Sequence, residues 1–263
     1  MSGEGNRVLL MDAGRLNSVR ELRGLPADGH SQGLAFSPDG RHIAAAAFLA
    51  PAGGEVRLWD VRTGEQVGEP MRLASVDLAF SPDGQHLAAA VLEGDSEVRS
   101  VPDGRLVARL RTGDDGRSVA FSPDGQTFAL GLYGGRVRMF STRDWKPVGR
   151  TIEGHRDRVT ALEYSRDGQR LLTGAADGTV RLWTAQQRQP IGSALTLAPE
   201  SYVSATFAPD GSEVFAVPDR GPAARWNMRP EAWARHACAV AGRPLTEREW
   251  RDALPQRPFQ PVC

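Results

Sequence analysis

Short stretches of alternating hydrophobic and polar residues run along the chain, and turn sequences separate them. Residues 159–164 and 179–184 are two such stretches, and the apolar stretch 170–173 lies between them. Alternation places successive side chains on opposite faces of a β-strand. A weaker fourth stretch follows residue 184. This segment is therefore predicted to form a small antiparallel sheet of four short strands.

The same unit recurs along most of the chain. Phe-Ser-Pro-Asp-Gly stands at 36–40, 80–84 and 121–125, and variants of it stand at 164–168 and 207–211. The aspartates at 39, 83, 124, 167 and 210 are 44, 41, 43 and 43 residues apart. Pro fixes φ, Asp bonds its own backbone and Gly accepts a positive φ, so each phrase makes a tight turn. A period of about 40–45 residues is typical of the four-stranded blade of a β-propeller.

The ends of the third strands carry a more specific pattern. Val56-Arg-Leu-Trp-Asp60 and Val180-Arg-Leu-Trp-Thr184 look like a Trp-Asp ending, and Gly29-His30 and Gly154-His155 look like a Gly-His opening. In these phrases the chain resembles the WD40 repeat family over roughly residues 7–228. The resemblance implies a non-enzymatic, all-β propeller whose loops bind another protein.

The resemblance also implies a hydrogen-bonded network that ties the strands of a blade together. The fourth repeat has the full set of residues for it, whereas the first keeps a His and a Trp but has Ala45 where the Thr would align. The expected network residues are His155, Thr173, Asp177 and Trp183 in the fourth repeat, and His30 and Trp59 in the first.

The strand count leaves the closure of the ring open. Residues 1–228 hold a partial blade at 7–23 and repeats near 29–72, 73–113, 114–153, 154–198 and 199–228. One alternative is a ring of about five blades, in which residues 18–22 complete the last blade and residues 8–11 are surplus. The other is the C-terminal part of an incomplete seven-bladed ring. We favour the second, because an initiator Met in mid-blade is unusual and a surplus edge strand is prone to unwanted pairing.

Residues 229–263 have a different, helical pattern. Pro230 can begin one helix, and Thr246-Glu-Arg-Glu249 reads as the capping box of a second short helix. This tail resembles one that follows WD40 propellers in many bacterial multidomain signalling proteins, where an NTPase or a kinase precedes the propeller. Cys238 and Cys263 are the two cysteines, and either a disulfide or two reduced thiols fits the sequence.

Composition narrows the choice of partner and compartment. Lys+Arg and Asp+Glu are 32 each, so the net charge is zero and the basic excess of a nucleic-acid binder is missing. Neither an apolar run of membrane-spanning length nor a secretory signal is visible in the sequence. A cytoplasmic protein is expected, or an extracytoplasmic one if the cysteines are bridged.

The sequence has no recognisable catalytic motif. It contains no phosphate-binding Gly-x-x-x-x-Gly-Lys-Ser/Thr, no Gly-x-Ser-x-Gly and no His-Glu-x-x-His. We expect no enzyme activity, no metal and no cofactor, and a scaffold or sensor that binds protein partners. A propeller enzyme and a truncated sensor propeller of a signalling NTPase or kinase are the alternatives. Candidate contact residues stand in the loops that vary most between repeats: Phe48, Glu93, Tyr133 and Arg220.

Overall fold

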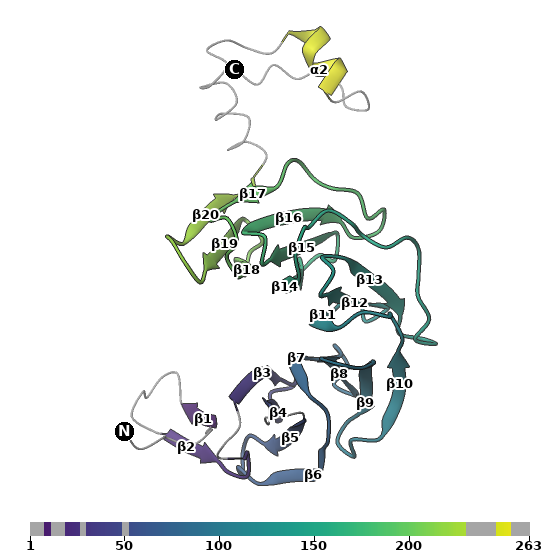
Figure 1. The fold of residues 1–263 in the computed structure, drawn as a ribbon, viewed down its shortest axis with the longest axis vertical. Coiled ribbons are helices and arrows are strands. Elements are labelled where there is room, and N and C mark those ends of the chain that lie inside the picture. The colour runs from purple at the N-terminus through teal and green to yellow at the C-terminus, as the bar shows by residue number, and fades with distance from the viewer. Residues whose placement is uncertain (1–7, 12–18, 27–29, 49–52, 230–245, 254–263) are drawn as a thin grey trace.

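The fold is almost entirely β-structure, as predicted. The computed structural model describes residues 8–11, 19–26, 30–48, 53–229 and 246–253. Within these residues the strands form six small antiparallel sheets, arranged side by side in an arc (Figure 1). Each large sheet begins on its inner side and runs outward in chain order, as in a propeller blade.

The strands divide into an N-terminal hairpin and five blades. The hairpin is β1 (Val8–Met11) and β2 (Val19–Leu22). The first blade is β3 (His30–Phe36), β4 (His42–Phe48), β5 (Gly54–Asp60) and β6 (Gln66–Met71). The second blade is β7 (Ser75–Phe80), β8 (His86–Val91), β9 (Ser96–Ser100) and β10 (Leu106–Leu110).

The last three blades are less regular at their outer edges. The third is β11 (Gly116–Phe121), β12 (Thr127–Leu132) and β13 (Val137–Ser141). The fourth is β14 (Val159–Tyr164), β15 (Arg170–Ala175), β16 (Thr179–Thr184) and β17 (Leu195–Thr196). The fifth is β18 (Val203–Phe207), β19 (Glu213–Pro218) and β20 (Ala224–Asn227). In the third blade, isolated bridges from Val137 to Ile152 and from Phe140 to Pro147 replace a regular fourth strand.

The hydrophobic core lies between the sheets, not inside any one of them. Each of the five hydrophobic clusters found among the described residues joins two consecutive sheets. The second strands supply many small side chains to these interfaces, as in the run of buried alanines at 44–47 of β4. Small side chains on both faces let neighbouring sheets approach closely, which is why strands buried on both sides carry them.

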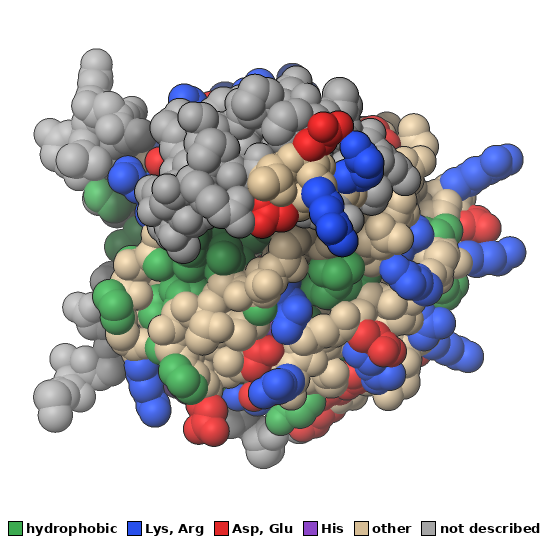
Figure 2. All heavy atoms as spheres, turned by 90° about the horizontal axis from the view of Figure 1, so that it is seen from above, with side chains coloured by type: hydrophobic (Ala, Val, Ile, Leu, Met, Phe, Trp, Pro, Cys, Tyr) green, Lys and Arg blue, Asp and Glu red, His purple; other side chains and the backbone are tan. Residues whose placement is uncertain are grey.

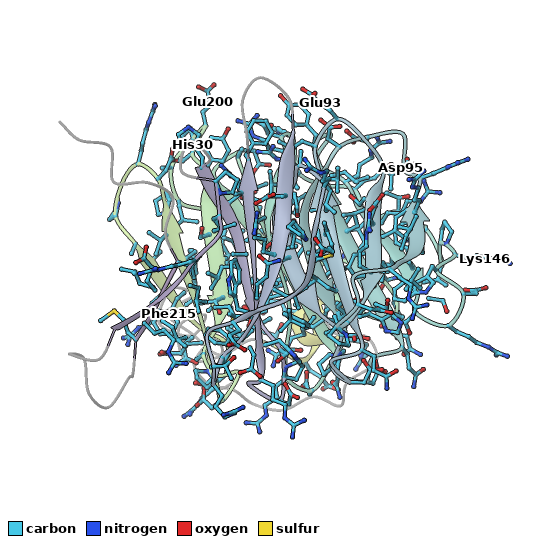
Figure 3. The ribbon with its side chains drawn as sticks, turned by 90° about the horizontal axis from the view of Figure 1, so that it is seen from below. His30, Glu93, Asp95, Lys146, Glu200 and Phe215 are labelled. Carbon is cyan, nitrogen blue, oxygen red and sulfur yellow. The ribbon has the colours of Figure 1, made fainter. Side chains whose placement is uncertain are left out.

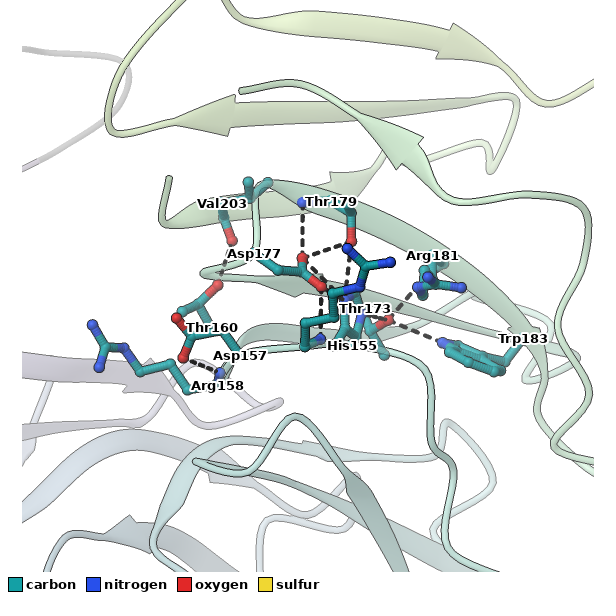
Figure 4. Close-up of polar contacts among 11 residues, drawn as sticks. His155, Asp157, Arg158, Thr160, Thr173, Asp177, Thr179, Arg181, Trp183 and Val203 are labelled. Carbon is teal, nitrogen blue, oxygen red and sulfur yellow. Dashed lines mark hydrogen bonds and ion pairs between the residues drawn. The ribbon is translucent and has the colours of Figure 1, made fainter. Parts of the chain in front are cut away.

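Hydrogen bonds between the innermost strands fix the blades relative to one another. The Asp77 carboxylate accepts the Val119 N–H at 2.9 Å, which links β7 to β11. The Ser118 hydroxyl donates to the Val159 carbonyl at 2.9 Å and links β11 to β14. The Thr160 hydroxyl donates to the Val203 carbonyl at 2.7 Å and links β14 to β18 (Figure 4). These bonds join β7, β11, β14 and β18, four of the five innermost strands, into one connected wall that faces the centre of the arc.

The N-terminal strand does not close the ring, as one of the two alternatives would have required. β2 pairs with β1 in register Val8 to Leu22, and β18–β20 form a separate sheet of three strands. The alternative in which residues 18–22 complete the last blade is therefore wrong. The hairpin packs instead on the outward face of the first blade, where Val8 and Leu22 contact the cluster around Trp59. Figure 1 shows the resulting gap between β1–β2 and the fifth blade.

The described part of the tail is the short helix α2 (Glu247–Ala253). Its predicted capping box is confirmed, because the Thr246 N–H donates to the Glu249 carboxylate at 2.9 Å and the Glu249 N–H donates to the Thr246 hydroxyl at 3.3 Å. The first predicted helix and both candidate disulfide residues, Cys238 and Cys263, lie outside the described residues.

Candidate functional site

The loops that vary between repeats gather on one end of the blades, which we call the top face. It carries Glu93 and Glu200 (Figure 3), and the Pro-Asp-Gly turns lie at the other end of the strands. Loops from a blade's second strand to its third, and loops from one blade to the next, meet on the top face. Neighbouring blades therefore contribute side chains to one continuous surface there.

The four predicted contact residues occupy different settings. Phe48 ends β4, half-buried and paired with Gly54, and the loop residues that follow it, 49–52, are not described. Glu93 is exposed at φ 54, and its N–H donates to the Asp115 carboxylate at 3.0 Å. Arg220 is exposed in the fifth blade, where its N–H donates to the Ser201 hydroxyl at 3.2 Å.

Tyr133, the fourth of these residues, belongs to a stacked group of aromatic and guanidinium side chains. Its ring is 48% exposed, and the Arg158 guanidinium carbon lies 5.3 Å from the ring centroid. Arg158 also donates to the Tyr133 hydroxyl at 3.3 Å. The same guanidinium carbon lies 4.4 Å from the ring centroid of Tyr202, which is 41% exposed. Arg158 thus contacts two exposed tyrosines from two other blades.

Arg117 extends the group by one more cation. Its guanidinium carbon lies 5.9 Å from the centroid of the Tyr133 ring, so two arginines lie near this ring. Burial and the neighbouring positive charge of Arg158 lower the pKa of Arg117. We call the set Arg117, Tyr133, Arg158 and Tyr202 the Arg–Tyr ladder. Each such cation–π contact contributes about 0.5–1 kcal/mol at an exposed site.

Backbone contacts hold the loops that carry the ladder. The Asp157 carboxylate accepts the Arg158 N–H at 2.7 Å, and the Asp115 carbonyl accepts the Tyr133 N–H at 2.9 Å. None of the salt bridges between described residues involves Arg117 or Arg158. The ladder therefore presents two aromatic faces and two cations without an ion-pair partner on a braced surface.

The predicted blade network of the fourth repeat lies just behind this surface (Figure 4). The Trp183 indole N–H donates to the Thr173 hydroxyl at 2.9 Å, and that hydroxyl lies 2.7 Å from His155 Nε2. His155 Nδ1 lies 3.2 Å from an Asp177 carboxylate oxygen, which also accepts the Arg156 N–H at 2.9 Å. Burial alone would raise the pKa of Asp177, but the hydrogen bonds from His155, Thr179 and Arg156 outweigh burial and lower it.

Two family models match parts of the chain. The description "WD domain, G-beta repeat" matches residues 146–184, the segment that holds this whole network. The fold, nearly all-β with six small antiparallel sheets, is consistent with a WD40 β-propeller. The description "Eukaryotic translation initiation factor eIF2A" matches residues 15–101, which reach from the N-terminal hairpin into the second blade. No curated protein matches the chain as a relative.

The first WD40 repeat does not form the corresponding network. His30 is exposed at the start of β3, and the Trp59 indole N–H donates to the Arg23 carbonyl at 2.9 Å. Ala45, which stands where Thr173 stands in the fourth repeat, has no hydroxyl to join a His and a Trp, and Trp59 bonds to the backbone instead of taking the network role that the resemblance implied. The propeller compensates locally, because the indole still has a backbone acceptor.

Sequence reasoning found one of the four ladder residues. Arg117 shares the third blade with Tyr133 and is brought near it by the pairing of β11 with β12, whereas Arg158 and Tyr202 come from the next two blades. The usable signal was positional, because each of these residues stands next to a loop of the top face.

Other classes of site have less support in the propeller. Among the described residues, no group of three or more His, Cys, Asp and Glu side chains is placed to hold a metal ion. None of the described helices is long and apolar enough to cross a membrane.

Proposed function

We propose that this propeller is a protein-interaction module whose binding surface is the top face, centred on the Arg–Tyr ladder. One observation carries the proposal: Tyr133 and Tyr202, which are 48% and 41% exposed, both lie within cation–π distance of Arg158. Tyr and Arg are the residue types enriched at the energetic centres of protein interfaces. WD40 repeats in general mediate protein–protein contacts, which is the class of function that this surface fits.

The arrangement also suits tight binding because little order is lost on association. The ladder residues are held by their stacking and by backbone contacts before a partner arrives. Fixing rotamer-rich side chains costs about 0.5–1.5 kcal/mol each, and a braced surface avoids part of that cost. A partner that covers the two tyrosine rings would bury apolar area at the centre of the interface. The two arginines could then form hydrogen bonds at the polar rim of the interface.

The test compares partner capture by matched variants. The double variant Tyr133→Ala and Tyr202→Ala removes both aromatic faces, and Leu106→Ala removes an exposed apolar side chain of the outer strand β10. Proteins crosslinked from native lysate are quantified for wild type and both variants. We expect a defined set to fall by at least about tenfold in the double variant, a loss of about 1.4 kcal/mol or more, and to stay with Leu106→Ala. Equal capture by all three proteins would contradict the proposal.

The proposed role is non-catalytic. The conserved chemistry of hydrolase and oxidoreductase sites needs convergent acids, bases, nucleophiles or metal ligands, and the ladder offers cations and phenols instead. A panel of esterase, phosphatase and peptidase substrates is expected to show no turnover above buffer. Turnover that the Tyr133→Ala variant abolishes would replace the binding role by an enzymatic one.

A finer proposal is that the propeller is the sensor of a larger signalling protein that carries an NTPase or a kinase. It is supported by the open arc, in which apolar side chains at both ends of the blade series stay exposed. The intact mass of the endogenous protein tests it. A mass well above 28.4 kDa is expected, whereas a mass at 28.4 kDa would leave the stand-alone interaction module.

A further inference from the structure

Two blades share one phrase but treat its arginine differently. Val-Arg-Leu-Trp stands at 56–59 in β5 and at 180–183 in β16. In the first blade, Arg57 Nε donates to the buried Glu55 carboxylate at 2.6 Å. Arg57 also donates to the Gln66 side chain, so this guanidinium has partners on two sides. The first blade shows what an arginine at this position needs, which is a carboxylate beside its Nε.

The fourth blade lacks that carboxylate. Thr179 stands where Glu55 stands in the first blade, two residues before the arginine. Its hydroxyl donates to the Asp177 carboxylate at 2.7 Å, so it serves the blade network and not Arg181. The Arg181 Nε is buried and has no hydrogen-bond partner among the described residues. A buried donor without an acceptor costs about 1–3 kcal/mol, more when it is charged.

Arg181 lines a pocket with more cations around it. The pocket lies between the outer segment 150–153 of the third blade and the strand β16, and Trp183 and Ile152 form its apolar wall. Arg150 and Arg188 line it as well, and Glu153 is its one acid. Arg188 donates to the Gln186 carbonyl at 3.2 Å, and no salt bridge between described residues involves any of the three arginines.

The geometry points to this pocket as the binding site for a carboxylate side chain of an acidic peptide segment in a protein partner. The ligand carboxylate would pair with the Arg181 guanidinium from the pocket, as the Glu55 carboxylate pairs with the Arg57 guanidinium. Guanidinium groups bind carboxylates through charge-assisted hydrogen bonds of matching shape. Arg150 and Arg188 add the positive field that favours an acidic segment, and the Trp183 wall covers its methylene groups. The pocket contains none of the ladder residues.

Arginine side-chain NMR tests this site directly. The protein is labelled with ¹⁵N, and the Nε–Hε signals of Arg181 and Arg57 are assigned by substitution. A capped hexaglutamate peptide is titrated in, with hexaglutamine as the neutral control and inorganic phosphate as the second anion. We expect the Arg181 signal to shift saturably with hexaglutamate, while the Arg57 signal stays because Glu55 already holds it.

Calorimetry on variants completes the test. Arg181→Gln should weaken hexaglutamate binding by at least about tenfold. The matched control Arg143→Gln removes an exposed arginine that does not line the pocket, so it should leave binding unchanged. Wild-type-like thermal unfolding of Arg181→Gln shows that the variant is folded, and an unfolded variant leaves the NMR titration of the wild type as the deciding measurement. An unmoved Arg181 signal, an equal shift with hexaglutamine, or unchanged affinity in Arg181→Gln overturns the proposal. Tighter binding of phosphate than of hexaglutamate would overturn the assignment to a carboxylate.

Discussion

The environments of Asp177 and Asp77 shift the pKa values of these two carboxylates in opposite directions. Asp177 receives hydrogen bonds from a histidine, a threonine and a backbone N–H, which lower its pKa despite its burial. Asp77 receives two backbone N–H bonds, from Leu78 and Val119, and burial outweighs them and raises its pKa to about 6. One carboxylate therefore stabilises the fold in its charged form, and the other is costly in that form.

The raised pKa of Asp77 predicts a pH dependence of stability. Its pKa is about 6 in the folded protein and about 4 in the unfolded chain, so the folded state binds more protons between these values. The contribution of Asp77 to the free energy of unfolding therefore rises by about 1 kcal/mol when the pH falls from 7 to 5. Urea unfolding at the two pH values measures it. Asp77→Asn should remove this increment, and an unchanged pH slope in the variant would contradict the assignment.

The Thr173 hydroxyl is the centre of the fourth-blade network. Thr173→Val keeps the shape of the side chain but leaves the Trp183 N–H and His155 without their shared partner. Stranding buried polar groups costs about 1–3 kcal/mol each, so we expect a loss of about 2–4 kcal/mol in the free energy of unfolding. Thr196→Val, at an exposed position of β17, is the control and should change little. Equal effects of the two substitutions would mean that the network is not stabilising.

Residue-scale prediction from the sequence succeeded where chemistry is written locally. The four network residues all belong to the fourth repeat, and the hydrogen bonds join them as the resemblance implied. The ladder could not be predicted in the same way. Arg117 and Arg158 lie 16 and 25 positions from Tyr133 along the chain, and strand pairing within the third blade and packing of the fourth blade bring them to it. The buried Arg181 Nε without a hydrogen-bond partner could not be predicted from the sequence either, because the packing around a side chain decides whether an acceptor reaches it.

At the scale of elements, the Pro-Asp-Gly turns follow from sequence almost completely. In the first four repeats a Ser hydroxyl donates to the turn Asp, as Ser37 does to Asp39 at 2.6 Å. In the fifth repeat Ala208 replaces that serine, and Ser212 beyond the turn donates to Asp210 at 2.6 Å instead. The outer strands were harder to predict, because their residues are polar and the third blade replaces its fourth strand by isolated bridges.

Two glycine turns offer a matched test of backbone constraint. Gly178, directly before β16, has a φ of +79°, and a Cβ there would lie 1.8 Å from the Ala198 carbonyl oxygen. Gly40 has a similar φ of +70 but no atom within 4 Å of such a Cβ. Gly40→Ala should cost only the left-handed penalty of about 1–2 kcal/mol. Gly178→Ala should cost clearly more, because backbone must move as well. Thermal unfolding of both variants measures this, and equal costs would contradict the close approach.

At the scale of the whole molecule, equivalent side chains of different repeats differ in solvent exposure, because the arc is open and its end blades have fewer neighbours. The aromatic ring that opens each turn phrase is 51% exposed at Phe36 but 8% at Phe80 and 7% at Phe207. The preceding blade covers the latter two rings, whereas the N-terminal hairpin leaves Phe36 open. At the other end, Phe215 is 39% exposed, while its counterpart Leu172 is 1% exposed. Phe215 is labelled in the view from below (Figure 3), and Figure 2 shows the opposite side of the molecule, where hydrophobic side chains are visible beside charged ones.

This difference predicts unequal costs for one substitution at equivalent positions. Phe80→Ala removes a ring packed between two blades and should cost about 3–5 kcal/mol of stability. Phe36→Ala removes a ring that is half in solvent and should cost about 1 kcal/mol or less. Chemical unfolding of the purified full chain provides both numbers. A large cost at Phe36 would mean that another sheet covers this face in solution.

One sheet per repeat, in chain order, was predictable from the period of about 43 residues. Ring closure was not, since the same strand 19–22 fits either edge by its pattern alone. Which edge it takes depends on the contact of Leu22 with the cluster around Trp59, a long-range packing choice.

In a series of sheets that contact only their neighbours, no strand exchange joins the first sheet to the last. Each interior blade is supported on both sides, whereas the fifth blade is supported on one side by the cluster it shares with the fourth. Stability in such a linear array is a sum of nearest-neighbour terms, so local opening begins at the ends and moves inward. Amide hydrogen exchange should then be slowest in the third blade and fastest in the fifth, a gradient that a closed ring would abolish.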